Sequence, residues 1–186
     1  SGTDTEVILH MLARQVSGTL AERLLRVMPQ LEGSYSLTVT DGKELVAARD
    51  PFGWRPLVLG KRTTKEGTAW IAASETPAIH LMGAEVVREV EPGEVVTLTA
   101  DGPISQRISV LPERRACVFE HVYFARPDSQ VFGQSVYETR KRFGARLADE
   151  QPAPGAEVVL PVPDSGVAAA LGYARQSGIP YELGLI

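Results

Sequence analysis

The sequence predicts an α+β domain that is followed by the beginning of an α/β domain. In residues 1 to about 110, two capped helical segments precede a run of short alternating strands, which is typical of α+β layering. In residues 157–186 the order is strand, helix, strand, which predicts parallel strands joined by a right-handed crossover. Because the two patterns meet near residues 105–117, we expect one domain over residues 1–105 and a second over residues 106–186.

Two helices are expected at the start of the first domain. Thr3 and Glu6 have the spacing of a capping box, and Thr19 and Glu22 repeat it. Pro29 is expected to end the second helix. Apolar residues recur at helical spacing after each cap, namely Val7, Ile8, Met11 and Leu12, then Leu20, Leu24, Leu25 and Met28.

A two-residue period then replaces the helical one. Tyr35, Leu37 and Val39 alternate with polar residues, as in a strand with one buried face, and Asp41-Gly42 is a hairpin signal. Further strands are expected in "ELVAAR", "PLVLGK", "AWIAAS" and "EVVTLT", with turns at residues 91–93 and 101–103.

The second domain opens with "CVFEHVYFARPDS", which we expect to be extended and to end in a Pro-Asp-Ser turn. A helix is expected over residues 135–149. A strand over 157–162, a helix over 166–177 with Gly178 at its end, and a strand over 181–186 follow it.

Composition excludes several classes of function. The 186 residues carry a net charge of -4 and no dominant basic patch, so no nucleic-acid partner is expected. No apolar run reaches the roughly 18 residues of a membrane span, and no signal peptide opens the chain. One cysteine excludes an internal disulfide framework. We therefore expect a cytoplasmic protein without a membrane partner.

The loop Pro163–Gly166 lies between an expected strand and an expected helix. Ligands bind beyond the carboxyl ends of parallel strands, and the first amides of a helix favour an anion. Ser165 could bind a phosphate or a hydrated Mg²⁺, Asp164 could hold a metal-bound water, and Gly166 would let a ligand approach the backbone. The alternative is a simple helix cap, because Asp and Ser are common there.

Several motifs resemble those of one enzyme family. "VVLPVPDSGVAAALGYARQSGIPYELGLI" resembles the first strands of the phosphoribosyltransferase domain of the amidophosphoribosyltransferases, and "CVFEHVYFARPDS" resembles the segment that opens it. "RDPFGWRPLVLGK" and "AASET" are similar to the second half of their glutaminase domain, and "TDTE" to its substrate-side Asp motif. The resemblance covers essentially the whole chain.

The resemblance implies a fold for each half. Residues 1–105 would be the second half of an α+β N-terminal-nucleophile glutaminase, a type-2 glutamine amidotransferase domain. Residues 106–186 would be a connecting segment and the first strands of an α/β type I phosphoribosyltransferase. Such an enzyme transfers ammonia from glutamine to phosphoribosyl pyrophosphate, which gives phosphoribosylamine, glutamate and pyrophosphate in the first step of purine biosynthesis.

The resemblance also implies roles for particular residues. Asp4 would receive the α-amino group of glutamine, and Asp164, Ser165 and Gly166 would form the pyrophosphate loop, with Ser165 near Mg²⁺. Cys117 would be one ligand of a [4Fe–4S] cluster in the branch of the family that carries one, although a lone cysteine is more often a small buried hydrophobe.

The family's cysteine nucleophile would lie upstream of residue 1, so the 186-residue chain alone is expected to be inactive. Ser1 is not expected to replace that nucleophile. The motif "RDPFGWRP", with its Arg49 and Asp50, is interpreted as structural support. The family further implies a homo-oligomer with purine nucleotides as feedback inhibitors. Two alternatives remain: a glutaminase-containing asparagine or aminosugar synthetase, and a non-catalytic scaffold protein.

Overall fold

A computed structural model describes residues 2–110 and 112–185, so the expectation for Ser1 lies outside the described residues. The chain divides into two compact units, Ser1–Cys117 and Val118–Ile186. This division falls after the predicted boundary at 105/106, because the connecting segment is hydrogen-bonded to the first unit. The amides of Arg115 and Cys117 donate to the carbonyls of Phe52 and Trp54 over 2.9 and 3.1 Å. The assignment of a glutaminase and a phosphoribosyltransferase domain to the two ranges stays a prediction.

Both helices expected at the start are present, as α1 (Asp4–Ala13) and α2 (Leu20–Val27). The capping box of α2 is confirmed, since Glu22 N donates to Thr19 Oγ1 over 3.2 Å and Thr19 N donates to Glu22 Oε2 over 2.9 Å. The capping box predicted for α1 is wrong. The Thr3 side chain makes no cap hydrogen bond, because the Glu6 amide donates to the Thr3 carbonyl instead. A 3₁₀ turn, η1 (Met28–Gln30), follows α2 and contains Pro29.

Two antiparallel sheets form the centre of the first unit. The first contains β1 (Ser36–Thr40), β2 (Leu45–Arg49), β6 (Glu94–Thr99) and β7 (Gly102–Arg107), in the order β1-β2-β6-β7. The second contains β3 (Val58–Thr64), β4 (Gly67–Ala73) and β5 (Glu85–Glu89), in the order β4-β3-β5. The predicted hairpin is confirmed: β1 and β2 pair across Asp41-Gly42, where Gly42 has a φ of +87°.

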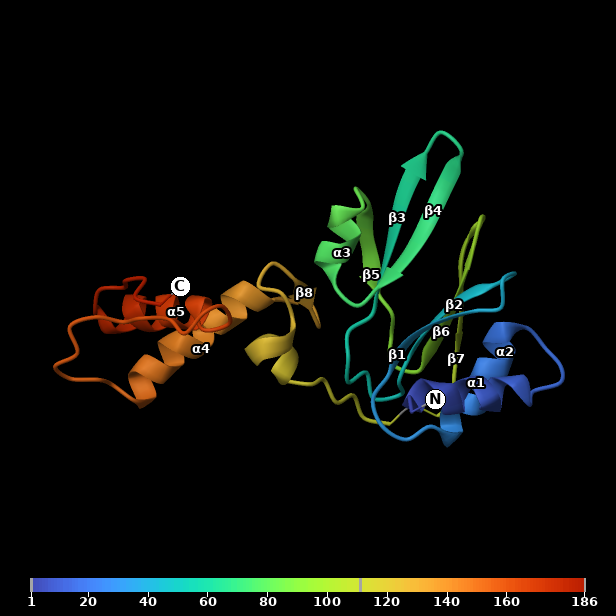
Figure 1. The fold of residues 1–186 in the computed structure, drawn as a ribbon, viewed down its shortest axis with the longest axis horizontal. Coiled ribbons are helices and arrows are strands. Elements are labelled where there is room, and N and C mark those ends of the chain that lie inside the picture. Colours follow the sequence, from blue (N-terminus) through green and yellow to red (C-terminus); the bar gives the residue numbers. More distant parts are fainter. Residues whose placement is uncertain (1, 111, 186) are drawn as a thin grey trace. The chain divides into compact units, whose positions relative to one another are not determined.

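Strand alternation gives this unit four layers. Val46 and Ala48 of β2 pack in one cluster with residues of α1 and α2, whereas Ala47 packs in a second cluster with Leu59 of β3. A third cluster joins β3 to a short helix that the sequence did not predict, α3 (Thr76–Leu81). The layers are therefore helix, sheet, sheet and helix, and Figure 1 shows α1 and α2 beside the first sheet and α3 beside β5.

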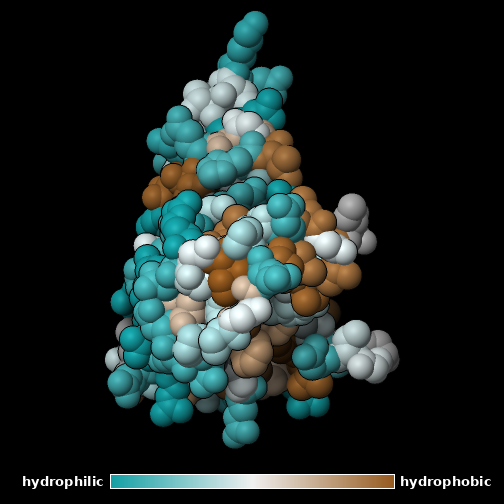
Figure 2. Space-filling model, turned by 90° about the vertical axis from the view of Figure 1, so that its left-hand side faces the viewer, coloured by the Kyte–Doolittle hydropathy of each residue, from teal (hydrophilic) through white to brown (hydrophobic). Residues whose placement is uncertain are grey.

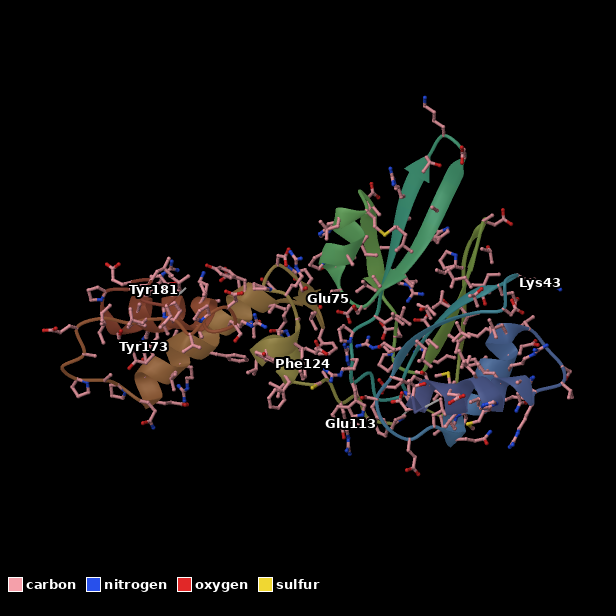
Figure 3. The ribbon with its side chains drawn as sticks, viewed as in Figure 1. Lys43, Glu75, Glu113, Phe124, Tyr173 and Tyr181 are labelled. Carbon is pink, nitrogen blue, oxygen red and sulfur yellow. The ribbon has the colours of Figure 1, made fainter. Side chains whose placement is uncertain are left out.

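The second unit is helical. Helix α4 (Val136–Glu150) confirms the helix expected over 135–149, and α5 (Val167–Ser177) confirms the next one. Before them lie η2 (Glu120–Phe124) and a two-residue hairpin of β8 (Gln130–Val131) and β9 (Gln134–Ser135). The extended conformation predicted for this segment is wrong over residues 118–124, because η2 is a π-helical turn in which Ala125 N donates to Glu120 O over 3.1 Å. The aromatic residues of η2, such as Phe124 (Figure 3), had favoured a strand.

The two strands expected around α5 are reduced to one parallel bridge between Val159 and Tyr181. The parallel direction is right, but the predicted length is wrong. Parallel strands need cover on both faces, whereas Leu160 and Val162 are 46% and 70% exposed.

Figure 2, which shows one face of the molecule, has brown apolar side chains among hydrophilic ones. Over residues 2–110 and 112–185, no helix is both long and apolar enough to cross a membrane.

Candidate functional site

The loop Pro163–Gly166 borders a cavity of about 420 Å³ in the second unit. Pro163, Asp164 and Ser165 form one side of this cavity. The other side comes from the end of η2 and the residues that follow it, and from α4: Tyr123, Phe124, Ala125, Pro127 and Arg140. We call this space the loop cavity. The structure therefore brings two of the predicted loop residues, Asp164 and Ser165, to one concave surface.

The loop does not serve as a side-chain cap for α5. The N-cap residue is Gly166, and no side chain makes a cap hydrogen bond. Among the residues that the structure describes, neither the Asp164 carboxylate nor the Ser165 hydroxyl makes a hydrogen bond or ion pair. Their polar groups are thus available to a ligand, and the cap alternative is wrong.

Backbone donors of α5 are also available. The Val167 amide donates to the Asp164 carbonyl over 3.3 Å, and the Ala170 amide donates to the Gly166 carbonyl over 2.9 Å. Within the described part of the chain, the amides of Ala168 and Ala169 make no hydrogen bond. Unpaired amides at a helix start favour an anion.

The turn requires a glycine at position 166 for a structural reason. A Cβ at this position would lie 2.6 Å from the Val162 carbonyl oxygen, which also accepts the Gly166 amide over 3.1 Å. The turn itself therefore requires glycine, and close approach of a ligand to Gly166 stays a prediction. The peptide bond between Pro163 and Asp164 is cis.

The donor set of the loop cavity fits a hydrated magnesium ion in part. Ser165 and Asp164 offer oxygen donors, which Mg²⁺ prefers, and Mg²⁺ is usually held by few protein oxygens with water and phosphate completing its shell. No cluster of three or more His, Cys, Asp or Glu that could hold a metal lies within residues 2–110 and 112–185. Any Mg²⁺ here would therefore depend on oxygens of water or substrate.

Asp4 borders a second cavity, of about 330 Å³, in the first unit. It stands at the first position of α1, and its Oδ1 accepts the Thr5 amide over 2.8 Å, which orients the carboxylate. The cavity also contains Glu32, which the sequence analysis missed because it lies in a loop without periodicity. Among the described residues that line this cavity there is no Lys, Arg or His, so the charge of the cavity suits a ligand ammonium group.

The motif "RDPFGWRP" is confirmed as structural support. Asp50 is fully buried, and its carboxylate accepts the amides of Phe52, Gly53 and Trp54 over 2.9–3.0 Å. Burial raises the pKa of Asp50, and these backbone bonds oppose the rise.

Arg49 completes this network and is 1% exposed. It donates to the carbonyls of Arg55 and Val90 over 2.8 and 2.6 Å and pairs with Glu89 over 3.5 Å. Burial lowers the pKa of Arg49, and the Glu89 charge opposes that change. Together, Arg49 and Asp50 fix the loop to which the connecting segment is bonded.

Cys117 is a free, partly buried thiol at the end of the connecting segment. It does not line the cavity that contains Asp4. A [4Fe–4S] cluster needs four thiolates, and this chain has one cysteine, so its residues alone do not fit the cluster. The role of Cys117 as a cluster ligand stays a prediction.

Comparison with known proteins gives the class first. A family described as "Glutamine amidotransferase domain" matches residues 1–81. This similarity lies within the layered first unit, so residues 1–81 are similar to a glutamine amidotransferase domain.

Relatives that match along the whole chain indicate one particular enzyme among the glutamine amidotransferases. Soybean (Glycine max) chloroplastic amidophosphoribosyltransferase is 49% identical over 99% of this chain and 32% of its own length. The amidophosphoribosyltransferases of Rhizobium etli and Bacillus subtilis are 48% and 42% identical over 100% of this chain and 38% of theirs. The chain thus spans about a third of the length of the curated relatives that it matches. The resemblance to the amidophosphoribosyltransferases is confirmed.

Solved structures agree. Glutamine phosphoribosylpyrophosphate amidotransferase from Bacillus subtilis, complexed with ADP and GMP, has a TM-score of 0.91 at 41% identity and covers 100% of this chain and 40% of its own. A structure described as the allosteric regulatory enzyme of purine biosynthesis has a TM-score of 0.90 at 42% identity and covers 98% of this chain. The glutaminase part of the fold prediction is therefore confirmed, and the phosphoribosyltransferase part remains a proposal.

Proposed function

We propose that this chain is part of an enzyme that transfers glutamine-derived ammonia to phosphoribosyl pyrophosphate, giving phosphoribosylamine, glutamate and pyrophosphate. This is the first step of de novo purine biosynthesis. The observation that carries the proposal is the loop cavity, in which the Asp164 carboxylate and the Ser165 hydroxyl are unused beside the unpaired amides of α5. In a simple helix cap, the Asp164 carboxylate or the Ser165 hydroxyl would accept a hydrogen bond from an amide of the first turn.

In this proposal Asp4 holds glutamine by its α-amino group. An oriented carboxylate that faces an ammonium group forms a charge-assisted hydrogen bond, and Glu32 adds negative charge to the same cavity. The nucleophilic thiolate that attacks the glutamine amide is not supplied by this chain, because its one cysteine does not line the Asp4 cavity.

At the second site, Ser165 and the first amides of α5 donate to the pyrophosphate that leaves C1 of the ribose. Asp164 lies beside Ser165 and would hold a water of a hydrated Mg²⁺. When bound, Mg²⁺ would neutralise charge on the leaving pyrophosphate. Gly166 keeps the turn tight, so that the Ser165 hydroxyl is presented at the helix start.

Further parts of the proposal concern the whole protein. One similar structure is complexed with ADP and GMP, which supports purine nucleotides as feedback inhibitors. A homo-oligomer, a cytoplasmic location and a cluster ligated by Cys117 follow from the family resemblance alone. The soybean relative is chloroplastic by name, so the location needs its own test.

Two alternatives are less well supported. An asparagine or aminosugar synthetase would account for the match over residues 1–81, but not for relatives that match through residues 118–186. A non-catalytic scaffold would not account for a loop with unused polar groups.

The test is an assay of the whole protein that contains this chain. Purified protein with Mg²⁺ and phosphoribosyl pyrophosphate should release pyrophosphate when either glutamine or ammonia is the nitrogen donor. Transfer of nitrogen to aspartate or to a sugar phosphate, without pyrophosphate release from phosphoribosyl pyrophosphate, would favour the synthetases. Absence of any turnover would favour the scaffold.

A further inference from the structure

Arg140 is a charged residue that the proposed chemistry does not use, and it is only 3% exposed. Its guanidinium binds one carbonyl before and one carbonyl after Tyr123 and Phe124, which line the loop cavity. Arg140 Nε donates to the His121 carbonyl over 2.6 Å, and a terminal nitrogen of Arg140 donates to the Ala125 carbonyl over 2.9 Å. A π-helical turn leaves carbonyls without ordinary helical partners, and Arg140 binds one of these, that of His121, together with the Ala125 carbonyl just after the turn.

The opposite wall is held by the same helix. Gly144 lies one turn after Arg140 on α4, and a Cβ there would be 1.8 Å from the Ala169 carbonyl oxygen of α5. A Cβ at Gly172 of α5 would likewise be 2.0 Å from the Lys141 carbonyl oxygen. The two helices therefore touch backbone to backbone, as their side-by-side course in Figure 1 indicates. Because the loop Pro163–Gly166 leads directly into α5, this contact fixes the place of Ser165.

One helix thus determines the separation of the two walls. We infer that Arg140 is a positioning residue for the proposed pyrophosphate site: it holds the wall at residues 123–125 at a fixed place opposite Ser165. This inference rests on the proposed function of the loop. A lysine would keep the charge but could not span both carbonyls, because only the planar guanidinium presents several donors in a fixed fork.

The experiment measures binding of inorganic pyrophosphate with Mg²⁺ to the whole protein by titration calorimetry. Arg140→Lys and Arg140→Met should both weaken binding by about tenfold or more, since small displacements of a preorganised site are costly. The matched control is Arg146→Met on the same helix. Arg146 is exposed and pairs with Glu150, and its replacement should leave affinity within about twofold.

A double-mutant cycle with Ser165→Ala adds a readout that loss of stability would not change. If Arg140 acts through the geometry around Ser165, the double variant should lose less affinity than the sum of the two single losses. Additive losses would overturn the inference. If Arg140→Met does not fold, Arg140→Lys and its double-mutant cycle with Ser165→Ala still test the inference.

The remaining outcomes separate the inference from the function on which it rests. Normal affinity in Arg140→Lys with a loss in Arg140→Met would assign the effect to charge, and would overturn the inference. Normal affinity in both variants with lowered melting temperatures would make Arg140 merely structural. If the unaltered protein does not bind pyrophosphate, the proposed function of the loop fails and the inference fails with it.

Discussion

The Val167 amide donates its hydrogen bond to the main-chain carbonyl of Asp164, over 3.3 Å, and not to the Asp164 side chain. A helix cap made by aspartate would show the opposite arrangement, in which the carboxylate accepts an amide of the first turn. The loop therefore starts α5 through its backbone and leaves its side chains at the edge of the loop cavity. This hydrogen bond therefore distinguishes the two interpretations of residues 163–166, a side-chain helix cap and a ligand-binding loop.

The 186-residue chain by itself should show no glutaminase activity. Thiol-dependent glutamine hydrolysis needs a nucleophile at the glutamine, and Cys117 does not line the Asp4 cavity. The measurement is glutamate release by the purified chain, with Cys117→Ala as the matched variant. If the chain released glutamate and Cys117→Ala abolished this release, Cys117 would be the nucleophile and the prediction would be wrong.

In the whole protein, Asp4→Asn should raise the KM for glutamine strongly and leave ammonia-dependent synthesis nearly unchanged. The substitution keeps the size of the side chain but removes the charge that faces the ammonium group. Glu6→Gln is a suitable control, because Glu6 lies on the same turn of α1 but does not line the cavity. Equal loss of both activities in Asp4→Asn would mean that Asp4 supports the fold.

Asp50→Ala should destabilise the first unit by about 3 kcal/mol or more. The substitution would leave the partly buried amides of Phe52 and Trp54 without their acceptor, and the buried Gly53 amide with only the Asp50 main-chain carbonyl. Urea unfolding of the chain measures the loss, and Asp101→Ala at an exposed turn is the control. A loss as small as that of the control would mean that the amides find other partners.

Stability of the first unit should also depend on pH through Glu94. This carboxylate is 4% exposed, and burial raises its pKa. Hydrogen bonds from Arg88 at 2.8 and 2.7 Å, from Ser105 and from the Glu91 amide, together with the Arg88 charge, outweigh burial and lower the pKa of Glu94. A lowered folded-state pKa gives stability that is complete above the unfolded value, about 4.3, and is lost as the pH falls through the folded value.

The matched variant for this pH dependence is Glu94→Gln. The free energy of unfolding that it loses should be larger at pH 7 than near pH 3, because the carboxylate is neutralised in acid. Urea unfolding at both pH values gives the comparison. An equal loss at the two values would show that the charge of Glu94 contributes nothing.

Much of the fold could be predicted from local signals in the sequence. The capping residues Thr19 and Glu22 and the alternation after Tyr35 depend on neighbours a few residues apart, so they were sufficient for α2 and for the first hairpin. The π-helical turn could not be predicted in this way. The His121 carbonyl of this turn accepts a hydrogen bond from Arg140, which is 19 residues away in the sequence.

The candidate site was predictable only in part, for the same reason. The position of Asp164 and Ser165 before a helix was visible in the sequence, and so was the acid at the start of α1. The opposite wall of the loop cavity comes from a π-helical turn, the residues after it and a buried arginine, and Glu32 lines the Asp4 cavity from a loop. None of these residues follows a sequence period. Whether Asp164 caps α5 depends on backbone geometry, which the residue types of the loop alone left open.

The central claim is that the loop Pro163–Gly166 binds the pyrophosphate of phosphoribosyl pyrophosphate. The most direct measurement is the ammonia-dependent kinetics of the whole protein with Ser165→Ala, because this assay does not involve glutamine. Loss of one hydrogen bond to a charged group should lower kcat/KM for phosphoribosyl pyrophosphate about tenfold to a hundredfold, at an unchanged melting temperature. Unchanged kinetics together with a lowered melting temperature would show that Ser165 only stabilises the helix start, and would contradict the account.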